Sequence, residues 1–265
     1  MSEQIRFFKK PVTDSTQPNV TATASQSSDL ASYATIRGFF AGWVTTGSVD
    51  ADNTTFEIDW VDERRVDSIF LLKHNFKAFT VQYWDGSTYQ NFSPAISETT
   101  NTEMDSFYSV TGVDTSKIKI TITGTMVANA DKYLYYAAAC ESLGQLEGWP
   151  LIKNPKVSKA TKVTRMLSGK ADVAQNVGGF SCELKVKHWR IVADLEIIEN
   201  LYSRYESFLV WLCGGDAAQF FFGPLGYTRR DLVLMRTVNE YEPEYVEGVY
   251  VNGLDLTIKL EEVVE

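Results

Sequence analysis

Hydrophobic and polar residues alternate along short segments in the first half of the chain. Between residues 55 and 60, Phe56, Ile58 and Trp60 fall on one side of an extended backbone, and the residues between them are polar. Residues 117–123 repeat this pattern with isoleucine at every second position, and a period of two is typical of a half-buried β-strand. Further strand-like segments are residues 68–72, 80–84 and 133–139. Because no long helical pattern precedes residue 150, we predict an all-β sandwich for this part.

The second half of the chain combines long strand-like segments with one helical pattern. Residues 156–167 and 179–191 are predicted as strands, and the polar stretch 168–178 connects them as a hairpin. We expect Asp194 to cap a helix, because hydrophobic residues then recur at helical spacing. These residues are Ile198, Leu201, Tyr202, Tyr205 and Phe208. Short strands follow, so this part is predicted to be α+β.

Two dipeptides predict tight hairpin turns. Asp85-Gly86 ends one strand-like segment, and Asn252-Gly253 lies between two others. Both dipeptides favour turns with positive backbone φ, which glycine adopts without strain. We therefore expect a positive φ at Gly86.

A stretch with two prolines and two glycines, residues 144–155, interrupts the periodic segments. Such a stretch is typical of a boundary between domains. We predict a mainly β chain of two domains: a β-sandwich over residues 1–147, and an α+β domain with one packed helix over residues 148–265.

Charge is distributed unevenly, although the 265-residue chain is acidic overall, with a formal net charge of −9. From Lys153 to Arg190 there are nine Lys/Arg and two Asp/Glu, a net charge of +7. From Ile191 to the end there are five Lys/Arg and fourteen Asp/Glu, a net charge of −9. The lysines could simply protect exposed strand edges. They could also meet an oppositely charged surface on an identical subunit, or face DNA in a pore, which the excess of carboxylates elsewhere makes the weakest alternative. The candidate subunit-interface residues are Lys156, Lys159, Lys162, Arg165, Lys185 and Lys187.

Catalytic motifs are missing from the sequence. The three cysteines and two histidines show no metal-ligand spacing, and there is no phosphate-binding loop or nucleophile elbow. Carboxylate pairs such as Glu242/Glu244 are common on acidic surfaces, so they do not by themselves indicate a glycosidase. We expect no enzyme, no metal ion and no cofactor. The longest apolar runs are too short to cross a bilayer and the N-terminus lacks a signal-like apolar segment, so we expect neither membrane insertion nor secretion.

Residues 14–142 resemble a galactose-binding-like (discoidin, F5/8 type C) jelly roll. The resemblance rests on NVTATASQSS, on TFEIDW followed by RRVDSIFLLKHN, on FTVQYWDGSTYQ and on KIKITIT. It implies a jelly-roll sandwich, with glycan binding through loops at one end. Aromatic residues on the expected loops are the candidate glycan contacts: Tyr33, Phe39, Phe40, Trp43, Trp84 and Tyr89. The alternative for most of them is a place in the core or in a subunit contact.

Residues 150–265 resemble the ring-forming, tail-tube-like domain of bacteriophage tail proteins, especially the distal tail protein. The basic hairpin, the helix VADLEIIENLYSRYESF followed by FLVWLCGGD, and the closing GYTRRDLVLMRTVNEYEPEYVEGVYVNGLDLTIKLEEV carry this resemblance. It implies a homo-oligomeric ring, a hexamer in the family, that contacts tube and tip or hub proteins in the virion tail after assembly in the bacterial cytoplasm. DNA would be cargo in the channel. Many distal tail proteins have the ring domain first, so the order of domains here is reversed.

Two functions therefore follow from the sequence. The first is a structural component of a bacteriophage tail, forming a ring at the end of the tube and linking it to tip or receptor-binding proteins. The alternative is a carbohydrate-binding adhesin module, whose partner would be a host-surface glycan.

Overall fold

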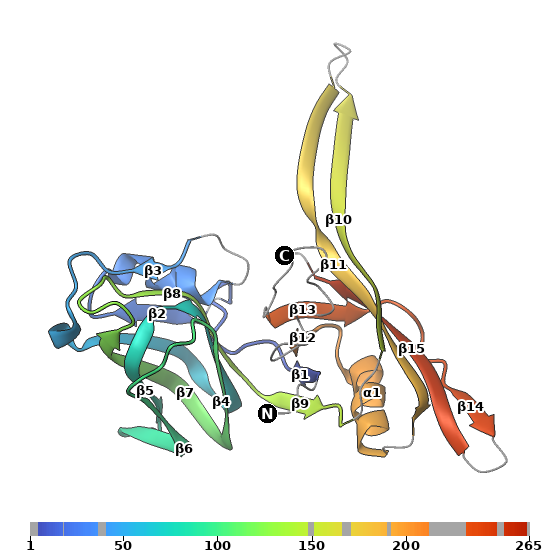
Figure 1. The fold of residues 1–265 in the computed structure, drawn as a ribbon, viewed down its shortest axis with the longest axis horizontal. Helices are drawn as coiled ribbons and strands as arrows, with labels where there is room; N and C mark the ends of the chain where they lie inside the picture. The colour runs from blue at the N-terminus through green and yellow to red at the C-terminus, as the bar shows by residue number, and fades with distance from the viewer. Residues whose placement is uncertain are drawn as a thin grey trace. The chain divides into compact units, whose positions relative to one another are not determined.

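The computed structural model describes residues 5–17, 19–36, 41–147, 151–165, 171–189, 192–211, 232–247 and 252–263, with the backbone alone for 151–165, 171–180, 187–189, 245–247 and 252. The chain divides into two compact units: a sandwich of residues 10–142, and a second unit made of residues 1–9 together with 143–265. Strands dominate both units, which confirms the predicted mainly β fold (Figure 1).

The observed units differ from the two consecutive domains predicted for residues 1–147 and 148–265. The short strand β1 (Arg6–Phe8) pairs antiparallel with β12 (Phe208–Trp211), and β9 (Ser142–Gln145) lies beside β1 in the same sheet. The backbone N–H of Leu146 also donates to the carbonyl of Ile5 at 3.0 Å. Because these segments flank residues 10–142 on both sides, the sandwich is an insertion that follows the first strand of the second unit.

In the described residues of the sandwich there are seven strands, in the order β3-β8-β4-β7-β5-β6, with β2 paired to β4. Their bounds are β2 (Thr21–Ala24), β3 (Trp43–Val44), β4 (Thr54–His74), β5 (Phe76–Trp84), β6 (Tyr89–Glu98), β7 (Ser106–Thr125) and β8 (Tyr133–Cys140). Two 3₁₀ helices, η1 (Ser28–Thr35) and η2 (Asp50–Asp52), complete the unit.

The long strands β4 and β7 contribute to both layers of the sandwich. Residues 54–59 of β4 pair with 117–122 of β7, and residues 64–71 pair with 106–115. Between these two registers the pairing breaks, and Val61 has a φ of 69°. A bulge of this kind bends a strand, so β4 pairs with β2 before the break and with β8 after it.

The sandwich core follows the alternation seen in the sequence. Phe56, Ile58 and Trp60 on β4 are buried, as are the three isoleucines of β7, while the residues between them are partly exposed. Trp43 closes the core with its ring 5.2 Å from that of Phe56. The period of two therefore located this core correctly.

The second unit contains one sheet in the order β10-β11-β15-β13-β12-β1-β9, with β14 paired to β15. Its remaining strands are β10 (Leu151–Arg165), β11 (Ala171–Trp189), β13 (Leu232–Thr237), β14 (Glu244–Glu247) and β15 (Asn252–Glu262). The predicted hairpin is present as β10–β11, but residues 171–178, expected in its connection, belong to β11.

The helix α1 (Val192–Arg204) packs against this sheet through Ile198 and Leu201, which are buried in the same hydrophobic cluster as Phe7. The helix begins at Val192, two residues before the predicted cap, so Asp194 lies in its first turn and is not the cap. The buried Asp194 carboxylate instead accepts a hydrogen bond from the backbone N–H of Glu147 at 2.8 Å. Phe208, assigned to the helix face from the sequence, begins β12.

The two predicted turns have different outcomes. Gly86 has a φ of 96°, which confirms the expected positive value. The turn is longer than a two-residue type I′ turn, because residues 85–88 separate β5 from β6. The prediction of a turn at Asn252-Gly253 is wrong, because both residues lie in β15 and pair with Glu247 and Val246 of β14.

Candidate functional site

One outer face of the sandwich carries an aromatic pair among charged side chains. Phe79 and Val81 on β5, and the isoleucines of β7, point into the core, so the residues between them face outward. Register places the outward residues of β6, β5, β7 and β4 side by side. We call these residues the Trp84 face: Gln82, Trp84, Tyr89, Asn91, Lys117, Lys119, Glu57 and Asp59.

Trp84 and Tyr89 are directly paired across the β5–β6 hairpin. Their ring centroids lie 5.1 Å apart at an interplanar angle of 65°. The loop between them is fixed by Asp85, whose carboxylate accepts the backbone N–H groups of Thr88 and Ser87 at 2.7 and 2.8 Å. These hydrogen bonds, from Thr88 first, hold the pKa of Asp85 well below its usual range. The loop therefore presents both rings in one defined arrangement.

The charges on the Trp84 face balance one another. Lys117 forms an ion pair with Asp59, whose hydrogen bond raises the pKa of the lysine. The Lys119 ammonium lies 3.7 Å from the centroid of the Tyr89 ring, a cation–π geometry. Burial raises the pKa of the Tyr89 phenol, and the Glu57 carboxylate raises it further. Two lysines and two carboxylates thus leave the Trp84 face without net charge.

The predicted glycan contacts do not form one group. The structure brings Trp84 and Tyr89 together, whereas Trp43 has no exposed surface and its Nε1 donates to the Gln26 carbonyl at 2.9 Å. A surface contact at Trp43 is therefore ruled out. Tyr33 is half-buried in η1. Phe39 and Phe40 lie outside the described residues.

Sequence reasoning missed the polar members of the Trp84 face. Lys117, Lys119 and Gln82 were visible as the outward positions of alternating strands, but only the pairing of β5 with β7 places them beside Trp84. Alternation along one strand shows on which side of the sheet a residue lies, but it does not show which residues of the neighbouring strands lie beside it.

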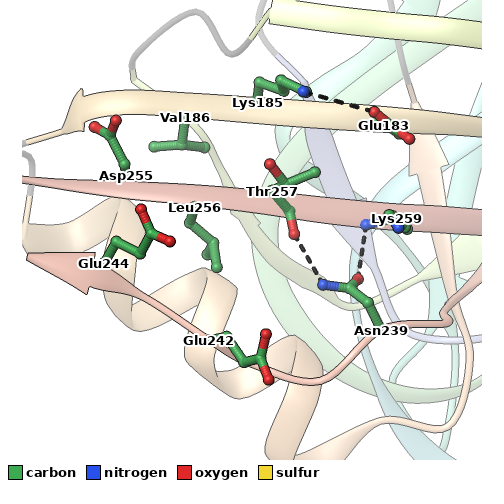
Figure 2. A pocket seen from close by; sticks show the side chains of 10 residues that line it. All are labelled: Glu183, Lys185, Val186, Asn239, Glu242, Glu244, Asp255, Leu256, Thr257 and Lys259. Carbon is green, nitrogen blue, oxygen red and sulfur yellow. Dashed lines mark hydrogen bonds and ion pairs between the residues drawn. The ribbon is translucent and has the colours of Figure 1, made fainter.

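A hollow of about 530 Å³ lies on the second unit, between β11, β15 and the segment that leads into β14 (Figure 2). We call it the acidic hollow, and its lining includes Glu183, Lys185, Glu242, Glu244, Asp255 and Lys259. Asn239 fixes one side, because its side chain donates to the Thr257 carbonyl at 2.9 Å and accepts from the Lys259 backbone N–H at 2.8 Å. Among the described lining residues, four carboxylates stand against two lysines, a net charge of −2.

The predicted subunit-interface residues are spread along β10 and β11. Lys156, Lys159, Lys162 and Arg165 lie on β10, where each pairs in register with a residue of β11, and their side chains lie outside the described residues. The side chain of Lys187 also lies outside them. Lys185 is half-buried, and its ammonium is 4.0 Å from the Glu183 carboxylate at the acidic hollow.

The histidine and the two cysteines that the structure describes have structural positions. His74 is buried; its Nδ1 accepts the backbone N–H of Phe76 at 3.1 Å, and its Nε2 lies 3.0 Å from the Ser106 hydroxyl. Burial lowers the pKa of His74 to about 4, so the ring is neutral near pH 7. Burial also raises the pKa of the Cys140 and Cys182 thiols, and Cys182 reaches about 12. A low-pKa thiolate is therefore absent at these two positions.

Within the described ranges, no group of three or more His, Cys, Asp or Glu residues is placed to hold a metal ion. In the same part of the chain, no helix has the length and apolar character needed to cross a membrane.

Comparisons with solved structures find carbohydrate-binding modules. Chitosan-binding module 1 from a chitosanase/glucanase of Paenibacillus sp. IK-5 is 15% identical, with a TM-score of 0.41, over 49% of this chain and 98% of the module. Chitosan-binding module 2 of the same enzyme, solved with chitotriose, is 13% identical, with a TM-score of 0.39, over 48% and 98%. A family 32 carbohydrate-binding module from C. perfringens, solved with galactose, is 20% identical, with a TM-score of 0.39, over 46% and 94%. No family model and no curated protein matches the sequence.

Proposed function

We propose that the sandwich binds carbohydrate through the Trp84 face. The observation that carries this proposal is the partly exposed Trp84 side chain, paired with Tyr89 on a charge-balanced sheet surface. An indole ring offers a rigid apolar surface on which the apolar side of a sugar ring can stack. The face without net charge suits an uncharged glycan better than an ionic ligand.

Polar groups around Trp84 can recognise sugar hydroxyls. The side-chain amides of Gln82 and Asn91 hydrogen-bond each other at 3.1 Å and retain further donors and acceptors. The Lys117–Asp59 ion pair lies on the other side, with the lysine ammonium 6.0 Å from the Trp84 ring. The aromatic rings and these oriented polar groups together supply the stacking and hydrogen-bonding contacts that can hold a sugar ring.

Binding is tested with galactose, an uncharged sugar, and with charged oligosaccharides of chitosan and pectin for comparison; these are the glycans named for the carbohydrate-binding modules similar in structure. We expect Trp84→Ala to weaken binding at least about tenfold, since a contact of this kind contributes roughly 2 kcal/mol. Trp84→Phe retains a stacking ring and should bind with intermediate affinity. Tyr33→Ala is the matched control at the other described aromatic candidate, and it should bind normally. Equal binding by wild type and Trp84→Ala, with both folded, would contradict the proposal.

A second candidate function concerns the second unit, for which we propose self-assembly as a non-catalytic structural subunit of a bacteriophage tail. The supporting observation is the outer part of the β10–β11 hairpin. Within the described ranges, residues 171–180 of β11 pair with β10 only, because pairing with β15 begins at Ser181. Figure 1 shows this two-stranded ribbon running past the sheet of the second unit. We call it the ribbon.

The ribbon favours assembly for a physical reason. A two-stranded hairpin is marginal in water by itself. In the sheet that the described residues form, β10 is the first strand, so its outer edge has no strand partner among them. A neighbouring subunit that pairs with or packs against this edge stabilises it. The proposed localisation is the virion tail, with tube and tip proteins as partners.

Self-assembly is tested by light scattering and negative-stain imaging of the pure chain across a concentration series. We expect closed rings, and we expect a variant with residues 159–177 replaced by a short turn to remain monomeric. A wild-type chain that stays monomeric at every concentration would contradict this proposal without affecting the glycan-binding one.

A further inference from the structure

We propose that Thr115, a buried residue of β7, is the positioning residue that fixes Trp84 and Lys117 relative to each other on the Trp84 face. This inference rests on the proposed carbohydrate binding and deepens it. Because its side chain is buried, Thr115 acts through the two residues proposed to contact the sugar and does not contact the sugar itself.

Regular backbone pairing stops beside Trp84. The register between β5 and β7 ends at the pair Tyr83–Ile118, one residue before Trp84. The register between β4 and β7 shifts between residues 117 and 115 of β7. Because the ladder of backbone hydrogen bonds is disrupted at such a shift, the ladder alone does not fix Trp84 against its neighbours on β7.

The Thr115 hydroxyl supplies contacts at this point. Its Oγ1 lies 2.8 Å from the Trp84 carbonyl oxygen and 2.9 Å from the Lys117 carbonyl oxygen, and its one proton can be donated to either. The same oxygen accepts the backbone N–H of Lys117 at 3.2 Å. One hydroxyl therefore joins the stacking residue to the lysine whose ammonium lies 6.0 Å from its ring.

Thr115 is itself held from the core. Its side chain is buried, and the Nε1–H of the buried Trp60 donates to its backbone carbonyl at 2.9 Å. The backbone of Thr115 also pairs in register with Arg64 on β4. A hydroxyl anchored in this way has one defined position, and a contact residue held in place before binding loses less freedom when the ligand arrives.

The test compares full-length variants that keep or lose this hydroxyl. Thr115→Val keeps the branched shape and removes the hydroxyl, whereas Thr115→Ser keeps the hydroxyl. Isothermal titration calorimetry measures their affinity for galactose and for the chitosan and pectin oligosaccharides. We expect Thr115→Val to bind about threefold to tenfold more weakly than wild type, the range that corresponds to one hydrogen bond. Thr115→Ser should bind within about twofold of wild type, because the hydrogen bonds remain.

Thr125→Val is the matched control for a general loss of stability. Thr125 lies at the other end of β7 and is buried, and its Oγ1 lies 2.7 Å from both the Asp50 carboxylate and the Val127 carbonyl. We expect both valine variants to lower the melting temperature, but only Thr115→Val to weaken binding. If Thr115→Val does not fold, Thr115→Ser and Thr115→Ala form a second pair that differs only in the hydroxyl, and the serine variant should bind more tightly.

The position of Trp84 can also be followed without sugar. In a proton–nitrogen NMR correlation spectrum of the full chain, the indole signal of Trp84 is the one that disappears in Trp84→Phe. We expect Thr115→Val to shift this signal and Thr125→Val to leave it in place.

Failure of the inference differs from failure of the proposed carbohydrate binding. If the wild type binds sugar and Thr115→Val binds equally well, or leaves the indole signal unchanged, Thr115 does not position the face, while carbohydrate binding stands. Equal weakening by Thr115→Ser and Thr115→Val would also overturn the inference, since the hydroxyl would not be the cause. If the wild type binds none of the three glycans, the proposed binding fails, and the indole signal alone decides whether Thr115 positions Trp84.

Discussion

Phe7 packs edge-on against Phe208, with ring centroids 5.8 Å apart and an interplanar angle of 76°. The two residues lie about 200 positions apart in the sequence, and both are fully buried in the core of the second unit. The contact shows that the beginning of the chain is part of this unit. The second unit therefore cannot complete its sheet until residues on both sides of the sandwich are in place.

Replacing Phe7 should destabilise the second unit selectively. Phe7→Ala removes a buried aromatic side chain, which costs about 3–5 kcal/mol in a well-packed core. Hydrogen exchange followed by mass spectrometry should show faster exchange in β12 and β13, with β4 and β7 protected as in wild type. Phe56→Ala is the matched control, because it should expose the sandwich strands instead. Equal loss of protection in both units would contradict the assignment of β1.

The sequence predicted local structure well and long-range pairing poorly. Alternation in residues 55–60 and 117–123 identified buried faces correctly, because the period of a strand depends on its own residues. The pairing of β1 with β12 gives no comparable signal, since three residues, Arg6–Phe8, are too few to show a period. The prediction at Asn252-Gly253 failed for the opposite reason. The local preference of this dipeptide for a turn is outweighed by the pairing of both residues with β14.

Position 86 should require glycine because of its backbone conformation, and not because a larger side chain would clash with its neighbours. Its φ is 96°, and a Cβ built at this position would meet no atom within 4 Å. Gly86→Val should therefore lower the unfolding free energy of the sandwich by about 1–3 kcal/mol through backbone strain alone. Gly86→Asn should cost less, because asparagine tolerates positive φ better than valine does. Thermal unfolding measures both, and equal melting temperatures for the two variants would contradict the interpretation.

The buried His74 should make the sandwich less stable as the pH falls. Its pKa is about 4 in the folded chain against 6.5 for the free side chain, so the unfolded state binds the proton first. The stability from neutral His74 is complete above pH 6.5 and is lost progressively towards pH 4, a loss of about 3 kcal/mol.

Chemical unfolding at pH 7, 6 and 5 measures this loss. His74→Asn keeps an acceptor for the Phe76 N–H and removes the titration, so its stability should depend less on pH over this range. Parallel pH profiles for wild type and His74→Asn would show that other groups cause the loss.

The candidate site was only partly predictable. Sequence reasoning named Trp84 and Tyr89, which the turn at residues 85–88 brings together, but it also named Trp43, which is buried. Tryptophan is both a core residue and a binding residue, so its identity does not reveal its exposure. The acidic hollow depends on Asn239 bridging to β15, a contact between distant residues that no local pattern indicates.

Lys132 should stabilise the sandwich through buried hydrogen bonds. Its side chain is fully buried, and its ammonium donates to the Ser48 hydroxyl at 2.6 Å and to the Val49 carbonyl at 2.8 Å. Lys132→Met keeps most of the side-chain volume but leaves these acceptors without their donor, at a cost of about 1–3 kcal/mol. In this variant, hydrogen exchange of the backbone amides around η2 should become faster by a larger factor than hydrogen exchange of the amides in β7. Lys77→Met, at an exposed lysine of β5, is the matched control and should change stability by less than about 0.5 kcal/mol. Equal stability of Lys132→Met and wild type would show that solvent or rearrangement satisfies these acceptors as well as the lysine does.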